Sequence, residues 1–274
     1  MAKNGPVPVT LDRHSDRSWH RFTSYDFARC RLECEIVSAE VSEAAASFPI
    51  AFRSSGGGVS PHAILATAAS PETPFVSDQG RWRATYVPSL LRCHPFSIEL
   101  VGGEAGSRTN SGKLVVDETT GLVSCDQSGS PFFAKDGSIS SELETLKGFL
   151  KSFLADCNAT RRACALIKEL GLFVELTRFQ DAELPSGWMS VDFRRFNQLG
   201  PAQTAVLQSS GAMQLIYAHQ VSLNHLLWMH HCQRHSPKVI STPANGRDSD
   251  LVGFLDAIAA ERDLSDAEAK YACL

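Results

Sequence analysis

The pattern of apolar residues changes near Gly137, and this change limits the possible folds more than any other feature of the chain. From Phe22 to about Val123, short apolar segments alternate with clusters of glycine, serine and proline, which is typical of strands and turns. From Leu143 onward, apolar residues recur with the spacing of a helix. No long polar linker separates the halves. The sequence therefore predicts an α+β fold in which a strand-rich N-terminal half packs against a helix-rich C-terminal half.

This division predicts three segments. We expect residues 1–20 to form a loosely ordered arm, residues 21–236 a single α+β domain, and residues 237–274 a loop followed by a helical tail. Strands are predicted at 48–52, 62–68, 81–87, 96–101, 113–117, 122–125, 172–177, 188–191 and 213–217. Helices are predicted from a capping box at Ser141 to Cys157, from a cap at Asn158 to Leu170, over 193–199, 201–209 and 222–234, and near Leu251.

Charge and hydropathy exclude two classes of partner. The formal net charge of -4 and the sequence pI of about 6.1 offer no general attraction to nucleic acid or to an anionic membrane. No stretch of about twenty apolar residues is present, so we expect no membrane span. The N-terminal residues lack the apolar run of a secretory signal, which predicts a cytoplasmic protein whose eight cysteines stay reduced.

The segment from Gly80 to Phe96 concentrates arginine and aromatic residues. Its candidate ligand-binding residues are Trp82, Arg83, Tyr86, Arg92 and His94. On one face of a strand, such side chains could recognise a carboxylate, a phosphate or a sugar acid through paired hydrogen bonds and ring stacking. The alternative is that the arginines pair with nearby acids such as Asp78 and Glu99, while the aromatic rings enter the core.

The same segment resembles the central motif of the SapC family, a bacterial group of about this length named after a surface-layer gene cluster. Six segments in the expected order carry the resemblance: Tyr25-Asp-Phe-Ala28, Phe48-Pro-Ile-Ala-Phe52, Pro74-Phe-Val76 with Gly80 and Trp82, Tyr86-Val-Pro88, Leu114-Val-Val-Asp117, and Leu215-Ile-Tyr-Ala-His219 with Ser222. Cys93 and His94 depart from the pattern, since an arginine-tyrosine pair is more usual there. The resemblance implies an accessory or binding protein of surface-layer assembly, export or outer-membrane uptake systems, which holds a small anionic ligand or a partner protein.

The resemblance also singles out His219, with Tyr217 and Ser222 beside it as further ligand-binding candidates. We expect these residues to share one pocket with Arg92. Two interpretations of His219 stay open: a buried, hydrogen-bonded structural histidine, or the general base of an enzyme that modifies a small molecule, with Arg92 orienting an anion. No G-x-S-x-G turn accompanies Ser222, so the sequence gives little support to acyl transfer.

Five of the nine histidines lie between His219 and His235. His231 and His235 are one turn apart if this segment is helical, which is a workable spacing for two metal ligands. No nearby acid offers a third ligand, and the alternative is a polar helix face beside Arg234. We therefore expect no metal and no other cofactor, and a metal-dependent protein remains a third possible function.

Overall fold

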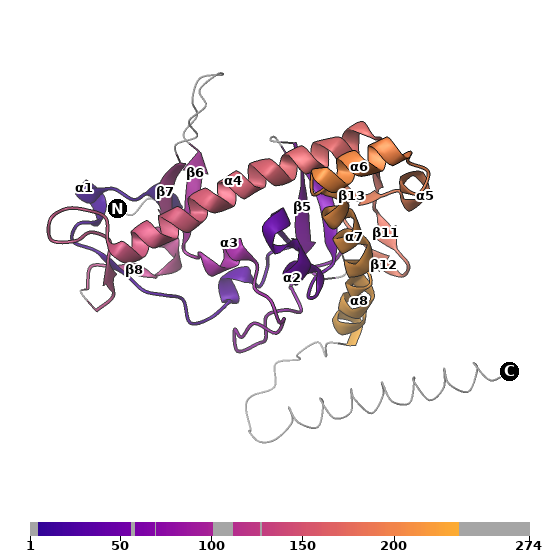
Figure 1. Ribbon diagram of the computed structural model, residues 1–274. Helices are drawn as coiled ribbons and strands as arrows, with labels where there is room; N and C mark the ends of the chain where they lie inside the picture. The colour runs from indigo at the N-terminus through magenta and orange to yellow at the C-terminus, as the bar shows by residue number, and fades with distance from the viewer. Residues whose placement is uncertain (1–4, 56–57, 69, 101–111, 127, 236–274) are drawn as a thin grey trace. The chain divides into compact units, whose positions relative to one another are not determined.

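A 29-residue helix, α4 (Ser141–Glu169), packs against two separate sheets in this computed structural model, which describes residues 5–55, 58–68, 70–100, 112–126 and 128–235 (Figure 1). The first half of α4 buries Leu143 and Leu150 in an apolar cluster with the three-stranded sheet that contains residues 6–8, 96–100 and 112–117. Its second half buries Ala163 and Ile167 in the cluster that covers the larger sheet. The strand-rich first half and the helical second half confirm the predicted α+β fold.

The larger sheet has five strands in the order β10-β13-β4-β5-β3, and every neighbouring pair is antiparallel. The strands are β3 (Glu33–Glu35), β4 (Ile50–Ser55), β5 (Gly58–Ile64), β10 (Phe173–Glu175) and β13 (Trp188–Val191). Ile50 and Phe52 point to one face of β4 and are fully buried. Helices α2 (Val41–Ala45) and α7 (Ala212–Ser222) pack against each other, and α7 also contacts β4 and β13.

The remaining strands form three small antiparallel sheets. One contains β1 (Pro6–Pro8), β6 (Phe96–Leu100) and β7 (Gly112–Asp117); the second contains β2 (Ser18–Trp19), β8 (Val123–Ser124) and β9 (Ser130–Pro131); the third contains β11 (Arg178–Phe179) and β12 (Ala182–Glu183). The other helices are α1 (Leu11–His14), α3 (Ser89–Arg92), α5 (Phe193–Phe196), α6 (Pro201–Ser209) and α8 (His225–His235), with 3-10 turns at Asp26–Ala28, Ser38–Glu40 and Glu118–Thr120.

Three element ends that depend on local chemistry lie where the sequence predicts them. Asp192 caps α5, since its carboxylate accepts hydrogen bonds from the N–H groups of Arg194 and Arg195. Pro201 occupies the first position of α6, where its missing N–H costs nothing. Gly171 follows α4 with a φ of 65°, a left-handed conformation that glycine adopts without strain.

Four secondary-structure predictions are wrong. Helix α4 continues through Asn158, because Thr160, Ala163 and Ile167 extend its buried face, and its cap is Ser140 instead of Ser141. Residues 213–217 are helical, since burial on α7 follows helical spacing, and α8 is a separate helix from α7. Residues 81–87 contain a single bridge, Val76 to Trp82, instead of a strand.

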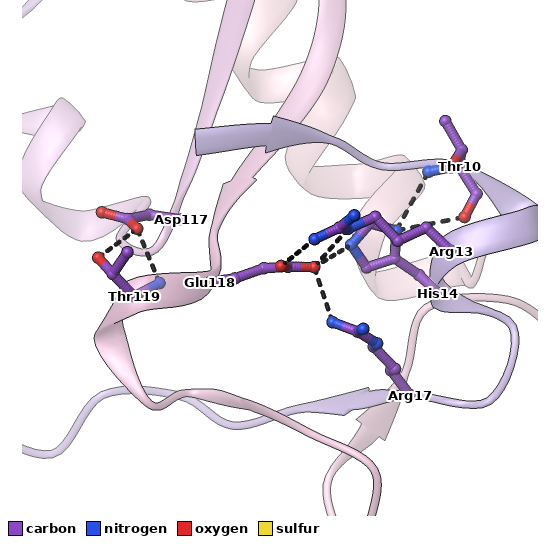
Figure 2. Close-up of polar contacts among 7 residues, drawn as sticks. All are labelled: Thr10, Arg13, His14, Arg17, Asp117, Glu118 and Thr119. Carbon is purple, nitrogen blue, oxygen red and sulfur yellow. Dashed lines mark hydrogen bonds and ion pairs between the residues drawn. The ribbon is translucent and has the colours of Figure 1, made fainter. Parts of the chain in front are cut away.

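Residues 5–20, which the sequence predicts to belong to a loose arm, contain two paired strands, and Val7, His14, Ser18 and Trp19 are buried. Strand β1 pairs with β7, and β2 pairs with both β8 and β9. Between β1 and β2, the side chains of Arg13, His14 and Arg17 all contact the carboxylate of Glu118 (Figure 2). Arg13 donates through Nε at 2.8 Å and Nη2 at 2.5 Å, and Arg17 through Nη1 at 2.8 Å.

His14 completes this cluster. Its ring is fully buried, with Nε2 3.3 Å from a Glu118 oxygen and Nδ1 beside the main chain of Thr10. Burial lowers the pKa of His14, and hydrogen bonds from Arg13 lower the pKa of Glu118. These contacts fix the N-terminal segment against η3 (Glu118–Thr120). The predicted tail, residues 237–274, lies outside the described residues.

Candidate functional site

Arg92 is positioned by the short helix that follows Pro88. Pro88 precedes α3 as its cap residue, and Arg92 lies in the last turn of that helix. The Nη2 of Arg92 donates to Ser89 Oγ at 2.8 Å and to Tyr86 Oη at 3.3 Å. The guanidinium carbon also lies 5.6 Å from the centre of the Tyr86 ring, within cation–π range. The guanidinium is therefore held in place, although the side chain is exposed.

Glu40 in turn holds the partners of Arg92. Its side chain is buried, and its carboxylate accepts hydrogen bonds from Tyr86 Oη at 2.6 Å, Ser89 N at 2.9 Å and Val37 N at 3.3 Å. Burial, with a smaller contribution from the hydrogen bond to Glu40, raises the pKa of Tyr86 to about 12. The hydroxyl therefore stays protonated and remains a donor. Among the ion pairs of the described residues, none includes Arg92. Its contacts are with neutral groups, which leave its charge available.

Arg92 lines a surface cleft with a volume of about 730 Å³, here called the Arg92 cleft. One wall comes from residues 19–25, another from residues 92–96, and the third from the first half of α4. The side chains that α4 supplies are Glu142, Thr145, Leu146 and Phe149. A smaller hollow of about 280 Å³ adjoins it and shares both Arg92 and Phe149.

Half of the residues that line the Arg92 cleft carry an aromatic ring or an imidazole. Its aromatic residues are Trp19, Phe22, Tyr25, Phe96 and Phe149. Trp19 and Phe96 meet edge to face at 5.0 Å, and Phe22 and Tyr25 do so at 5.1 Å, so these rings are fixed by one another. Phe149 is 41% exposed, which leaves it available for contact.

His94 also lines the Arg92 cleft. Its ring stacks on that of Phe27, with 3.7 Å between the ring centres and 8° between the planes. Burial lowers the pKa of His94, with a smaller lowering from Arg31. The imidazole is therefore neutral near neutral pH and acts as a ring surface there.

Charges differ between the two hollows. The Arg92 cleft contains the guanidinium groups of Arg21 and Arg92 and the single carboxylate of Glu142. The smaller hollow contains three acids, Glu40, Glu43 and Asp156, with Arg92 as its cation. Positive charge is therefore in excess only on the aromatic side of Arg92.

Two predicted ligand residues of the central segment lie outside both hollows. Trp82 is half-buried and packs against the core, where its Nε1 donates to Tyr86 O at 2.7 Å and its ring lies 5.3 Å from that of Tyr25. Arg83 is exposed, and its main-chain N–H is bonded to Phe75 O. Of the five candidates in this segment, the structure brings together Tyr86, Arg92 and His94.

His219 is enclosed on α7. It is 0% exposed, and its Nδ1 lies 2.6 Å from Ile50 O, so it donates to that carbonyl. Its Nε2 then accepts from Ser190 Oγ at 2.9 Å and from Val191 N at 3.2 Å. Burial lowers the pKa of His219 to about 4. Neither hollow lined by Arg92 includes His219.

The neighbours of His219 on α7 differ in exposure. Ser222 is buried, where its hydroxyl donates to His219 O at 2.9 Å and accepts from Ile50 N at 3.0 Å. Tyr217 is 51% exposed and contacts the edge of Phe196. His219 joins α7 to β4 and β13, and Ser222 joins it to β4. None of the three α7 candidates lines the Arg92 cleft.

The metal-site alternative at His231 and His235 involves the side chain of His235, which lies outside the described side chains. Within the described residues, no group of three or more histidine, cysteine, aspartate or glutamate side chains is close enough to hold an ion. The stretch that contains these two histidines is helix α8.

Several cleft residues escape the sequence prediction. Trp19 and Phe22 lie in or beside the segment predicted to be a loose arm, and Phe149 belongs to the apolar stripe predicted to face the core. The one available signal is the position of Phe149 at the margin of that stripe, where the residues one helical turn away, Thr145 and Ser152, are polar. Nothing in the sequence places residues 19–25 next to α4.

Comparison with protein families gives a match over most of the chain. A family model described as SapC matches residues 10–227, which is most of the chain and includes all three walls of the Arg92 cleft. No curated protein and no solved structure shows a significant match.

Proposed function

The chain belongs to the SapC family, and we propose that it is a binding protein whose Arg92 cleft holds a small anionic ligand. In this proposal it acts as an accessory component of a bacterial surface-layer, export or outer-membrane uptake system and works from the cytoplasm. The family resemblance supports that setting, and the cleft supports the binding role. The described helices include none long and apolar enough to cross a bilayer.

The observation that carries the proposal is the state of Arg92. Its guanidinium is oriented by Ser89 and Tyr86, both neutral, and it lies on a cleft where positive charge is in excess. A guanidinium that is already oriented loses little conformational entropy when it binds a carboxylate or phosphate. The Glu40 network supplies this orientation without occupying the guanidinium.

The size and lining of the cleft favour a small molecule over a protein partner. Ligand sites commonly measure about 300–1,000 Å³ and combine apolar walls with a few placed polar groups. The Arg92 cleft, at about 730 Å³, has ring-bearing walls and a small number of charged groups.

The alternative, an enzyme with His219 as general base, gains no support from this arrangement. Both ring nitrogens of His219 already have partners, and its ring is closed to solvent. A general base must reach the proton that it removes. The contacts of His219 are those of a residue that joins α7 to β4 and β13.

Thermal-shift screening tests the proposal, because a ligand that binds the native state raises the midpoint of unfolding. We expect carboxylates, sugar acids or organic phosphates to stabilise the wild-type protein. Arg92→Gln should raise the dissociation constant of the stabilising ligand by about 10- to 100-fold, because the ligand loses a hydrogen bond to a charged group.

Arg83→Gln is the matched control, since Arg83 is exposed in the same segment but lies outside both hollows. It should bind like the wild type. Equal weakening by both substitutions would show that general charge, instead of the Arg92 cleft, governs binding. Absence of any stabilising anion would refute the binding role.

A further inference from the structure

We infer that the ligand of the Arg92 cleft is a flat monocarboxylate with an aromatic body, a conclusion that rests on the proposed binding function. Two features of the lining lead to it: the balance of charges around Arg92 and the number of rings that face the cleft. Each restricts a different part of the ligand.

The charges favour a single negative charge. The Arg92 cleft contains two guanidinium groups, those of Arg21 and Arg92. Only Arg92 also lines the smaller hollow, which adds three carboxylates next to it. Glu142 adds another carboxylate within the cleft. A dianion such as a phosphate monoester would meet like charges on two sides, whereas a monocarboxylate matches the two donors of one guanidinium edge.

His94 does not change this balance. It is stacked on Phe27 and half-buried, and its burial lowers its pKa. The ring therefore contributes a neutral flat surface at neutral pH instead of a third positive charge.

The rings favour an aromatic body. Trp19 and Phe96 are nearly buried in the wall, while Phe149 is 41% exposed where the two hollows meet. Ring-to-ring contacts add to the free energy that area burial alone provides, provided that the ligand is flat enough to lie against them. An aromatic ligand therefore gains more from these walls than a saturated ligand of equal size.

Trp19 adds a donor that lacks an acceptor. Its residue is 7% exposed, and its indole Nε1–H has no hydrogen-bond partner among the described residues. A buried donor without a partner costs free energy. This donor is closed to solvent inside the wall, so the indole ring, and not its N–H, is what Trp19 offers to a ligand in the Arg92 cleft.

Isothermal titration with matched probes tests this inference. The probes are naphthoate, its neutral amide naphthamide, naphthyl phosphate, and the saturated acid cyclohexanecarboxylate. We expect naphthoate to bind about 10-fold or more tightly than each of the others, in line with one hydrogen bond to a charged group or one ring contact.

Variants then locate the binding. Arg92→Gln should abolish the preference for naphthoate over naphthamide, and Arg92→Lys should keep part of it, because lysine retains the charge but not the paired donors. Phe149→Ala should weaken naphthoate binding, with Tyr217→Ala as the control, since Tyr217 is similarly exposed outside the cleft.

The outcomes separate this inference from the proposed function. Tighter binding of naphthyl phosphate would overturn the monocarboxylate while leaving an Arg92-dependent anion site intact. Equal binding of naphthoate and naphthamide would also overturn the monocarboxylate, and the thermal-shift comparison of Arg92→Gln with Arg83→Gln would then decide whether the anion-binding function stands. Tighter binding of cyclohexanecarboxylate would overturn the aromatic body. If no probe binds but another anion shows Arg92-dependent stabilisation, the ligand class is wrong and the binding function stands. If no anion of any class binds, both fail.

Discussion

Replacement of His219 by glutamine should remove a large part of the pH dependence of stability in this protein. The folded protein holds the ring neutral, since burial lowers its pKa from 6.5 to about 4. In the unfolded chain the ring titrates near its ordinary value. Protons therefore bind the unfolded state more readily, and the stability that His219 provides is complete above about pH 6.5 and is lost as the pH falls toward 4.

The magnitude follows from these two pKa values. Between about pH 7 and about pH 5, proton binding to His219 alone should lower the free energy of unfolding by about 2 kcal/mol. His14, His62 and His94, whose pKa values are also lowered mainly by burial, act in the same direction. These three remain in both proteins, so the difference between wild type and variant isolates His219.

His219→Gln keeps an amide that can donate to Ile50 O and accept from Val191 N, but it does not titrate. It should destabilise the protein by about 1–3 kcal/mol near pH 7, through lost packing against Phe52 and Phe193 and poorer hydrogen bonds. Near pH 5 this deficit should shrink by about 2 kcal/mol or reverse.

Urea unfolding of both proteins, followed by far-ultraviolet circular dichroism at the two pH values, measures these free energies. A deficit that is the same at both pH values would refute the reasoning, because it would mean that the ring of His219 does not change its affinity for protons on folding.

Two further substitutions test other parts of the fold. Glu118→Gln should lower the free energy of unfolding by about 1.5–3 kcal/mol, because the Glu118 carboxylate is buried between two guanidinium groups. The control Glu144→Gln removes only an exposed ion pair and should change the free energy of unfolding by less than about 0.5 kcal/mol. Equal urea midpoints for the two variants would contradict this difference. Gly80→Ala should destabilise by more than about 1 kcal/mol, since Gly80 has a φ of 74° and an added Cβ would lie 1.9 Å from Ser24 Oγ. Gly171→Ala has open space around the new Cβ, so a thermal midpoint as low as that of the Gly80 variant would argue against the steric reason.

The candidate site was only partly predictable from the sequence. Arg92, Tyr86 and His94 are close in the chain, so the central segment alone indicated them, and the structure brings all three to the two hollows. The prediction that His219 would join Arg92 required two distant segments to meet. The structure places His219 against Ile50 and Val191 instead, where the core needs a group that both donates and accepts.

Residues whose structure depends on their nearest neighbours were determined by the sequence itself. The cap at Asp192, the start of α6 at Pro201 and the end of α4 at Gly171 follow from local hydrogen bonding and backbone freedom, which a few adjacent residues fix. The change from strand-like to helical spacing likewise specified the α+β class.

Burial between distant segments was decided only by the tertiary structure. Residues 5–20 are polar enough to suggest a free arm, yet Glu118, more than 100 residues away, binds Arg13 and Arg17 and holds them in place. The same docking brings Trp19 and Phe22 opposite Phe149 and so forms the Arg92 cleft. Local propensities do not encode which apolar faces meet, because that choice depends on the free energy of the whole packed core.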